Sequence, residues 1–168
     1  MFSFLKKKIM SFDVGTELLK IIGEFSKVST KALQELSEVT GRERLSNEIL
    51  YLNIFAADVA VSLALGNSRA KEAVREVFHK HLVQMSEKYT SATALYDQIL
   101  DRLEAYDKAI RFPPKPLGEG YPIKQAVGET FAELCGMEGN ALVIWQGSFI
   151  FHGTYGSVLK FVQSVRIV

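Results

Sequence analysis

The residues of this chain whose types could do chemistry are two histidines, an asparagine and an aspartate set in apolar segments. They are His81, His152, Asn53 and Asp58. A neutral imidazole can bind a ligand or move a proton, and a carboxylate in an apolar groove can act as a general acid or base. These four residues are our candidates for ligand binding, and no residue is assigned a catalytic role.

Asn53 and His81 are predicted to meet across a helical hairpin. Asn53 lies in the apolar segment 49–65, and His81 lies in the centre of the apolar face of the next predicted helix. In an antiparallel hairpin that turns near Asn67, positions 53 and 81 are level with each other. Because buried polar groups need partners, we expect a hydrogen bond between the two side chains, direct or through water. We favour a satisfied core contact over the start of a ligand pocket.

Asp58 is predicted to be less buried than Asn53. On a helical wheel it shares one narrow strip with other polar side chains, which are Asn47, Tyr51 and Ser62. The favoured interpretation is a solvated strip on a mostly buried helix. The alternative is a carboxylate whose pKa is raised by an apolar groove.

A metal site is not expected. Glu76 and His79 have the Glu-x-x-His spacing with which bundle helices present two ligands to one metal ion. No second such motif occurs in the chain, and this one lies on the charged face of its helix. We therefore interpret it as a surface pair. A metal site that combines His81 with His152 has no support beyond residue type.

Cys135 is the single cysteine, which excludes an internal disulfide and a multi-cysteine metal cage. No neighbouring charge or helix N-terminus lowers its pKa, so we interpret it as a small core residue. The chain has no glycine-rich phosphate loop, nucleophile elbow or His-Glu-x-x-His motif. No cofactor is expected.

The elements that must position these residues are helices. Apolar side chains recur three or four residues apart and predict four long helices, over residues 13–39, 41–65, 69–89 and 91–110. Thr40 and Glu43 have the spacing of a capping box at the start of the second helix. Gly66 suits the left-handed position that ends it.

The last third of the chain begins with the Pro- and Gly-rich connector 112–121, followed by a short helix over 122–135. Residues 141–159 then contain no charged side chain. We expect a central bundle helix there, capped by Asn140, because apolar residues recur at helical spacing. The alternative is a hairpin of strands that turns at residues 146–147.

Length and composition indicate one globular domain. The chain has 168 residues, of which 48% are hydrophobic and 23% charged, and a formal net charge of +1. We expect an all-α helical bundle of about six helices over residues 1–168, with the antiparallel hairpin and the apolar C-terminal helix at its core. Its parts are an N-terminal arm or short helix (1–12), four long helices (13–111), the connector (112–121) and the C-terminal helices (122–168).

The expected function is an interaction or structural role in the cytoplasm. Self-association or binding to a protein partner requires the fewest specific sequence features. The contact would be made through the first long helix, the N-terminal arm or the C-terminal segment. The near-zero net charge argues against nucleic acid, and a disulfide-linked partner is not expected. One alternative is an enzyme or a small-ligand or metal-binding protein, with a pocket near His81, Asn53 and His152. The other is peripheral membrane attachment through residues 1–8.

Overall fold

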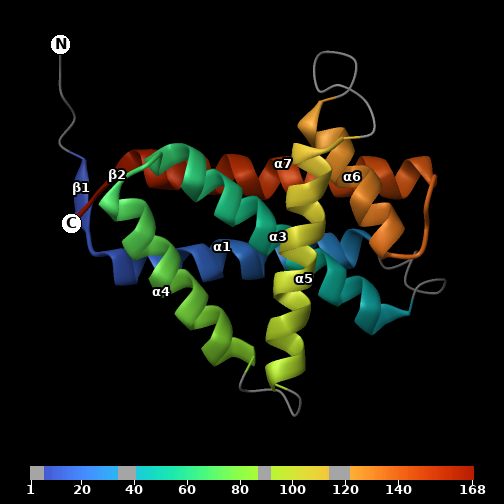
Figure 1. The fold of residues 1–168 in the computed structure, drawn as a ribbon, viewed down its shortest axis with the longest axis horizontal. Helices are drawn as coiled ribbons and strands as arrows, with labels where there is room; N and C mark the ends of the chain where they lie inside the picture. Colours follow the sequence, from blue (N-terminus) through green and yellow to red (C-terminus); the bar gives the residue numbers. More distant parts are fainter. Residues whose placement is uncertain (1–5, 34–40, 87–91, 114–121) are drawn as a thin grey trace.

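Six helices and two short strands form the part of the chain that the structure describes, residues 6–33, 41–86, 92–113 and 122–168 of a computed structural model (Figure 1). The helices are α1 (Ser11–Ala32), α3 (Arg42–Leu65), α4 (Arg69–Ser86), α5 (Ala92–Arg111), α6 (Ile123–Leu134) and α7 (Ala141–Ser164), and the strands are β1 (Lys7–Ile9) and β2 (Val165–Ile167). The predicted all-α bundle is confirmed.

Two helix ends are set by residues that the sequence identifies, a glycine that ends one helix and an asparagine that caps another. Gly66 ends α3 with φ 53°, a left-handed value that favours glycine. Asn140 caps α7, because its side-chain oxygen accepts hydrogen bonds from the backbone of Leu142 and Val143. The segment that was open to a strand hairpin is therefore a helix. Thr40 of the predicted capping box lies outside the described residues, as does most of the predicted connector.

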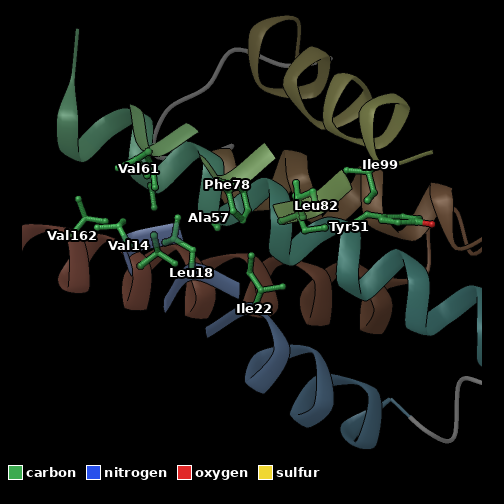
Figure 2. Packing of buried hydrophobic residues seen from close by; sticks show 14 residues of the cluster. Val14, Leu18, Ile22, Tyr51, Ala57, Val61, Phe78, Leu82, Ile99 and Val162 are labelled. Atoms are coloured by element: carbon green, nitrogen blue, oxygen red, sulfur yellow. The ribbon is translucent and has the colours of Figure 1, made fainter. Parts of the chain in front are cut away.

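Helix α3 runs through the centre of the bundle and packs against α1, α4, α5 and α7. Twelve of its residues are buried. One core cluster joins α3 to α1, α4 and the end of α7, with Leu18, Phe78 and Val162 among its side chains (Figure 2). A second cluster joins α3 to α5, α6 and the first half of α7. Helix α3 is long and apolar enough to cross a membrane by length and composition, and 61% of that stretch is buried inside the fold.

Helices α6 and α7 approach closely because each contributes a glycine. A Cβ atom added at Gly128 would lie 2.3 Å from the carbonyl oxygen of Ile144, and one added at Gly147 would lie 2.7 Å from the ring of Phe131. The inner side of α7 thus packs on α1, α3 and α6, as expected of a core helix.

The strands β1 and β2 were not predicted. They pair in parallel, with Lys7 opposite Val165 and Ile9 opposite Ile167, at the end of the bundle where α7 ends (Figure 1). Three residues are too few to show the alternation that identifies a strand, and the pairing joins the two ends of the sequence. Residues 6–9 therefore lie on their own domain. Phe2, Phe4 and Leu5, which the membrane alternative needs, lie outside the described residues.

Candidate functional site

Asn53 is completely buried where α3 meets α1 and α7, and its hydrogen bonds stay within the core. Its side-chain nitrogen donates to the hydroxyl oxygen of Ser26 on α1 at 3.0 Å. The hydroxyl of Thr154 on α7 donates to its side-chain oxygen at 2.5 Å. The predicted hydrogen bond to His81 is wrong. The hairpin argument considered only α3 and α4, whereas the partners come from the two other helices that pack on α3.

His81 lies at the contact between α4 and α1. Its ring is half-buried against the ring of Phe12, with centroids 5.1 Å apart. Gly15 faces it so closely that an added Cβ atom would lie 3.1 Å from His81 Nδ1. That nitrogen is buried and has no hydrogen-bond partner. His81 therefore packs between α4 and α1 in this structure, and its surroundings are separate from those of Asn53.

Asp58 joins α3 to α4. The guanidinium of Arg75 donates two parallel hydrogen bonds to its carboxylate, from Nε to Oδ1 at 2.8 Å and from Nη2 to Oδ2 at 3.0 Å. The side chain of Asp58 is 18% exposed, so it stands at the edge of the bundle. The predicted solvated strip is wrong in part, because Tyr51 is buried with its hydroxyl donating to Gln98, and Asp58 is held by an ion pair rather than left to water.

Glu76 and His79 lie on the outer part of α4, and His79 has its contact on α5. Glu76 is exposed, and His79 Nδ1 shares a 3.4 Å hydrogen bond with the hydroxyl of Tyr96 on α5. In the described part of the chain, no group of three or more His, Cys, Asp or Glu side chains is placed to hold a metal ion.

A buried ion pair between α3 and α5 was not predicted from the sequence. Glu48 is 2% exposed, and Arg102 Nε donates to both of its carboxylate oxygens at 2.9 Å, while Nη2 donates to Oε1 at 2.8 Å. The missed signal is that each charge stands on the apolar stripe of its helix, Glu48 with Leu45 and Leu52, and Arg102 with Ile99 and Tyr106. An acid on one stripe and a base on another predict a cross-helix pair.

Cys135 is a core residue, as predicted. It is 1% exposed, and burial, followed by the charge of Glu48, raises the pKa of its thiol to about 12. Burial also raises the pKa of the nearby Tyr106 well above its ordinary value. A thiol that stays protonated is a poor nucleophile, so neither group offers reactive chemistry.

His152 is exposed on α7, at the edge of a groove between α6 and α7 of about 400 Å³. Among the residues that line this α6–α7 groove are Lys124, Glu129, Ile144, Trp145, Phe149 and His152. The hydroxyl of Ser148 also lines it, but donates to the carbonyl of Ile144 in its own helix at 2.8 Å. Of the four candidate residues, His152 alone lines this groove. The pocket expected from His81, Asn53 and His152 together is not formed, since the three lie in separate surroundings.

The largest side chains beside the groove are apolar and exposed. Leu142, Trp145 and Phe149 are 55%, 58% and 63% exposed. They stand three and four residues apart, so they share one side of α7, which we call the α7 face. The rings of Trp145 and Phe149 stack with centroids 5.7 Å apart and planes 22° apart. A helical wheel could have found this face, because it lies opposite the buried Gly147, Ile150, Phe151 and Thr154.

Comparison with known proteins found no match to this chain among family models, curated proteins or solved structures. The geometry of the candidate site is therefore what supports a function. A stacked aromatic pair on the uncharged stretch 141–159 of α7 is suited to binding apolar surface.

Proposed function

We propose that this chain is a self-associating interaction protein and that a second copy binds at the α7 face. The observation that carries the proposal is the exposure of Leu142, Trp145 and Phe149, each by more than half, on one side of one helix. Large apolar side chains grouped in this way are unfavourable in water, and the free energy falls when a partner covers them.

Charge favours a second copy as the partner. Residues 141–159 carry no charged side chain, so this part of α7 can lie against the same part of a second copy without bringing like charges together. Lys124 and Glu129 add one charge of each sign at the border of the groove. A two-fold axis places the same patch on both sides of an interface, which suits a face that neither repels itself nor needs a differently charged partner.

The stacked rings provide anchors for such an interface. Trp145 and Phe149 offer large contact areas, and aromatic side chains dominate the binding energy of many interfaces. Because their mutual stacking limits their motion, little side-chain entropy is lost when a partner covers them.

The test uses Trp145, which is the only tryptophan in the chain, so its fluorescence reports directly on the α7 face. We expect light scattering to give a dimer, and the tryptophan emission to shift to shorter wavelength as protein concentration rises. In the double variant Leu142→Ser and Phe149→Ser, which keeps Trp145, the protein should be a monomer and the emission should not depend on concentration.

A matched control places serine at similarly exposed apolar positions elsewhere, Val28→Ser on α1 and Leu63→Ser on α3. This variant should remain a dimer. A wild-type protein that is monomeric at every concentration contradicts the proposal, and so does a dimer that the control variant breaks and the α7 variant does not.

A further inference from the structure

A larger cleft lies between α5 and α6, beside the start of α7, and has a volume of about 750 Å³. This falls in the range of roughly 300–1,000 Å³ typical of small-molecule sites. Its walls are made of small and apolar side chains, chiefly Ala105, Ala109, Ala126, Thr130, Leu134 and Ile144. We call it the α5–α6 cleft. Three alanines on two facing helices leave room for a slim apolar body.

The border of the α5–α6 cleft is acidic. Glu129, Glu133 and Glu138 are among the described residues that line it, and so is Lys108, whose Nζ lies 2.7 Å from the carboxylate of Glu104. That ion pair offsets the positive charge of Lys108. The described lining of the cleft therefore carries a net negative charge, although the whole chain is nearly neutral.

An aromatic ring also lines the cleft. Phe112, just beyond the end of α5, lines the cleft and is 78% exposed. The face of an aromatic ring attracts cations, and ammonium groups are commonly recognised by aromatic rings together with carboxylates. An exposed Phe and three carboxylates that line one cleft are the chemistry of a site for an organic cation.

We propose that the α5–α6 cleft binds a small organic cation that has an apolar body, such as an alkylammonium compound. The apolar part lies between the alanines of α5 and α6, and the positive group lies at the mouth between Phe112 and the carboxylates of Glu133 and Glu138. An anion of the same shape is excluded by these carboxylates, and a neutral molecule gains only the apolar contact. This site does not depend on the proposed self-association.

The experiment compares three probes of equal chain length by titration calorimetry on the full chain: hexyltrimethylammonium, hexanol and hexanesulfonate. The ammonium compound should bind with one-to-one stoichiometry, hexanol about tenfold or more weakly, and hexanesulfonate not at all. Repeating the titration with the variant Leu142→Ser and Phe149→Ser separates this site from self-association. The ammonium compound should bind that variant with the same affinity.

Substitutions then place the probe. The double variant Glu133→Gln and Glu138→Gln should weaken binding of the ammonium compound about tenfold, because two surface charge contacts are lost. Phe112→Leu should weaken it about twofold to fivefold. The matched control, Glu43→Gln and Glu72→Gln, removes two exposed carboxylates that do not line the cleft and should leave the affinity unchanged.

Three results overturn the proposal. They are equal binding of hexyltrimethylammonium and hexanesulfonate, unchanged affinity in the Glu133 and Glu138 double variant with its circular dichroism intact, and no heat of binding for the ammonium probe at millimolar concentration.

Discussion

Helices α3 and α7 are each 24 residues long and both carry a long apolar run, but the bundle treats them differently. Helix α3 is enclosed by four helices and buries twelve residues, including the charged Glu48. Helix α7 has no charge from residue 141 to residue 159, yet it buries seven residues and leaves Trp145 and Phe149 in water. The helix with more charged residues lies deeper, because its buried polar side chains, Glu48, Tyr51 and Asn53, have partners on neighbouring helices. Apolar sequence alone therefore does not locate the core, and an apolar side without a partner indicates a contact surface.

The largest expected loss of stability follows when a buried charge on α3 loses its partner. Replacing Arg102 by Met should lower the free energy of unfolding by about 3–5 kcal/mol, because the carboxylate of Glu48 is then buried without its cation. Urea unfolding followed by circular dichroism measures this. Arg75→Met is the matched control, since its partner Asp58 is more exposed than Glu48, and it should cost about 1 kcal/mol. Equal losses in the two variants would show that burial of Glu48 is not what makes its partner necessary.

The contact that joins α3 to α7 has the next largest expected effect. Asn53→Ala should cost about 2–3 kcal/mol, because the buried hydroxyl of Thr154 loses its acceptor and Ser26 loses its donor. Denaturant unfolding measures the loss. The double variant Asn53→Leu and Thr154→Val removes both partners together and should recover part of it. If the double variant is less stable than either Asn53→Leu or Thr154→Val alone, the shape of the site contributes more to its stability than its hydrogen bonds do.

The helices could be predicted because their apolar residues recur at one period over many turns, and because Gly66 and Asn140 mark ends through local chemistry. The strands could not, since β1 and β2 are three residues each and pair across nearly the whole sequence. Local patterns are visible in a sequence, whereas pairings between distant segments depend on how the helices are arranged.

The candidate site shows the same limit. The burial of Asn53 was predictable from its position on α3, but its partners were not, because Ser26 and Thr154 lie on helices whose placement the hairpin geometry does not give. His152 was selected by residue type, whereas Trp145 beside it was not, although the exposure of its ring is the informative fact. Residue type identifies chemistry, but which face of an apolar helix remains uncovered is decided by tertiary packing.

The core cluster that α3 and α7 share should be sensitive to alkali. Burial raises the pKa of Cys135 from 9.0 to about 12, so above pH 9 the unfolded chain loses this proton while the folded chain keeps it. The unfolded state then binds fewer protons, and the free energy of unfolding falls as pH rises from 9 toward 12, by about 1.4 kcal/mol per pH unit for this thiol.

Urea unfolding at pH 8 and pH 10 checks this, with Cys135→Ala as the comparison. Between these two values the wild type should lose about 1.4 kcal/mol more than the variant, because the variant lacks the contribution of the thiol to the slope. Parallel losses in both proteins would place the alkaline sensitivity elsewhere, for instance at Tyr106, whose pKa burial also raises.

The smallest expected effect on stability comes from a substitution on the exposed side of α7, compared with one on its buried side. Trp145→Ala should change the free energy of unfolding by no more than about 0.5 kcal/mol at protein concentrations where the chain is a monomer, because the ring contributes little to the core. Phe151→Ala, on the buried side of the same helix, should cost about 3–5 kcal/mol. At concentrations where two copies associate, the cost of Trp145→Ala should grow, since binding stabilises the folded state by mass action. A large cost at low concentration would make Trp145 part of the fold, and the uncovered side of α7 would then no longer differ from the enclosed surface of α3.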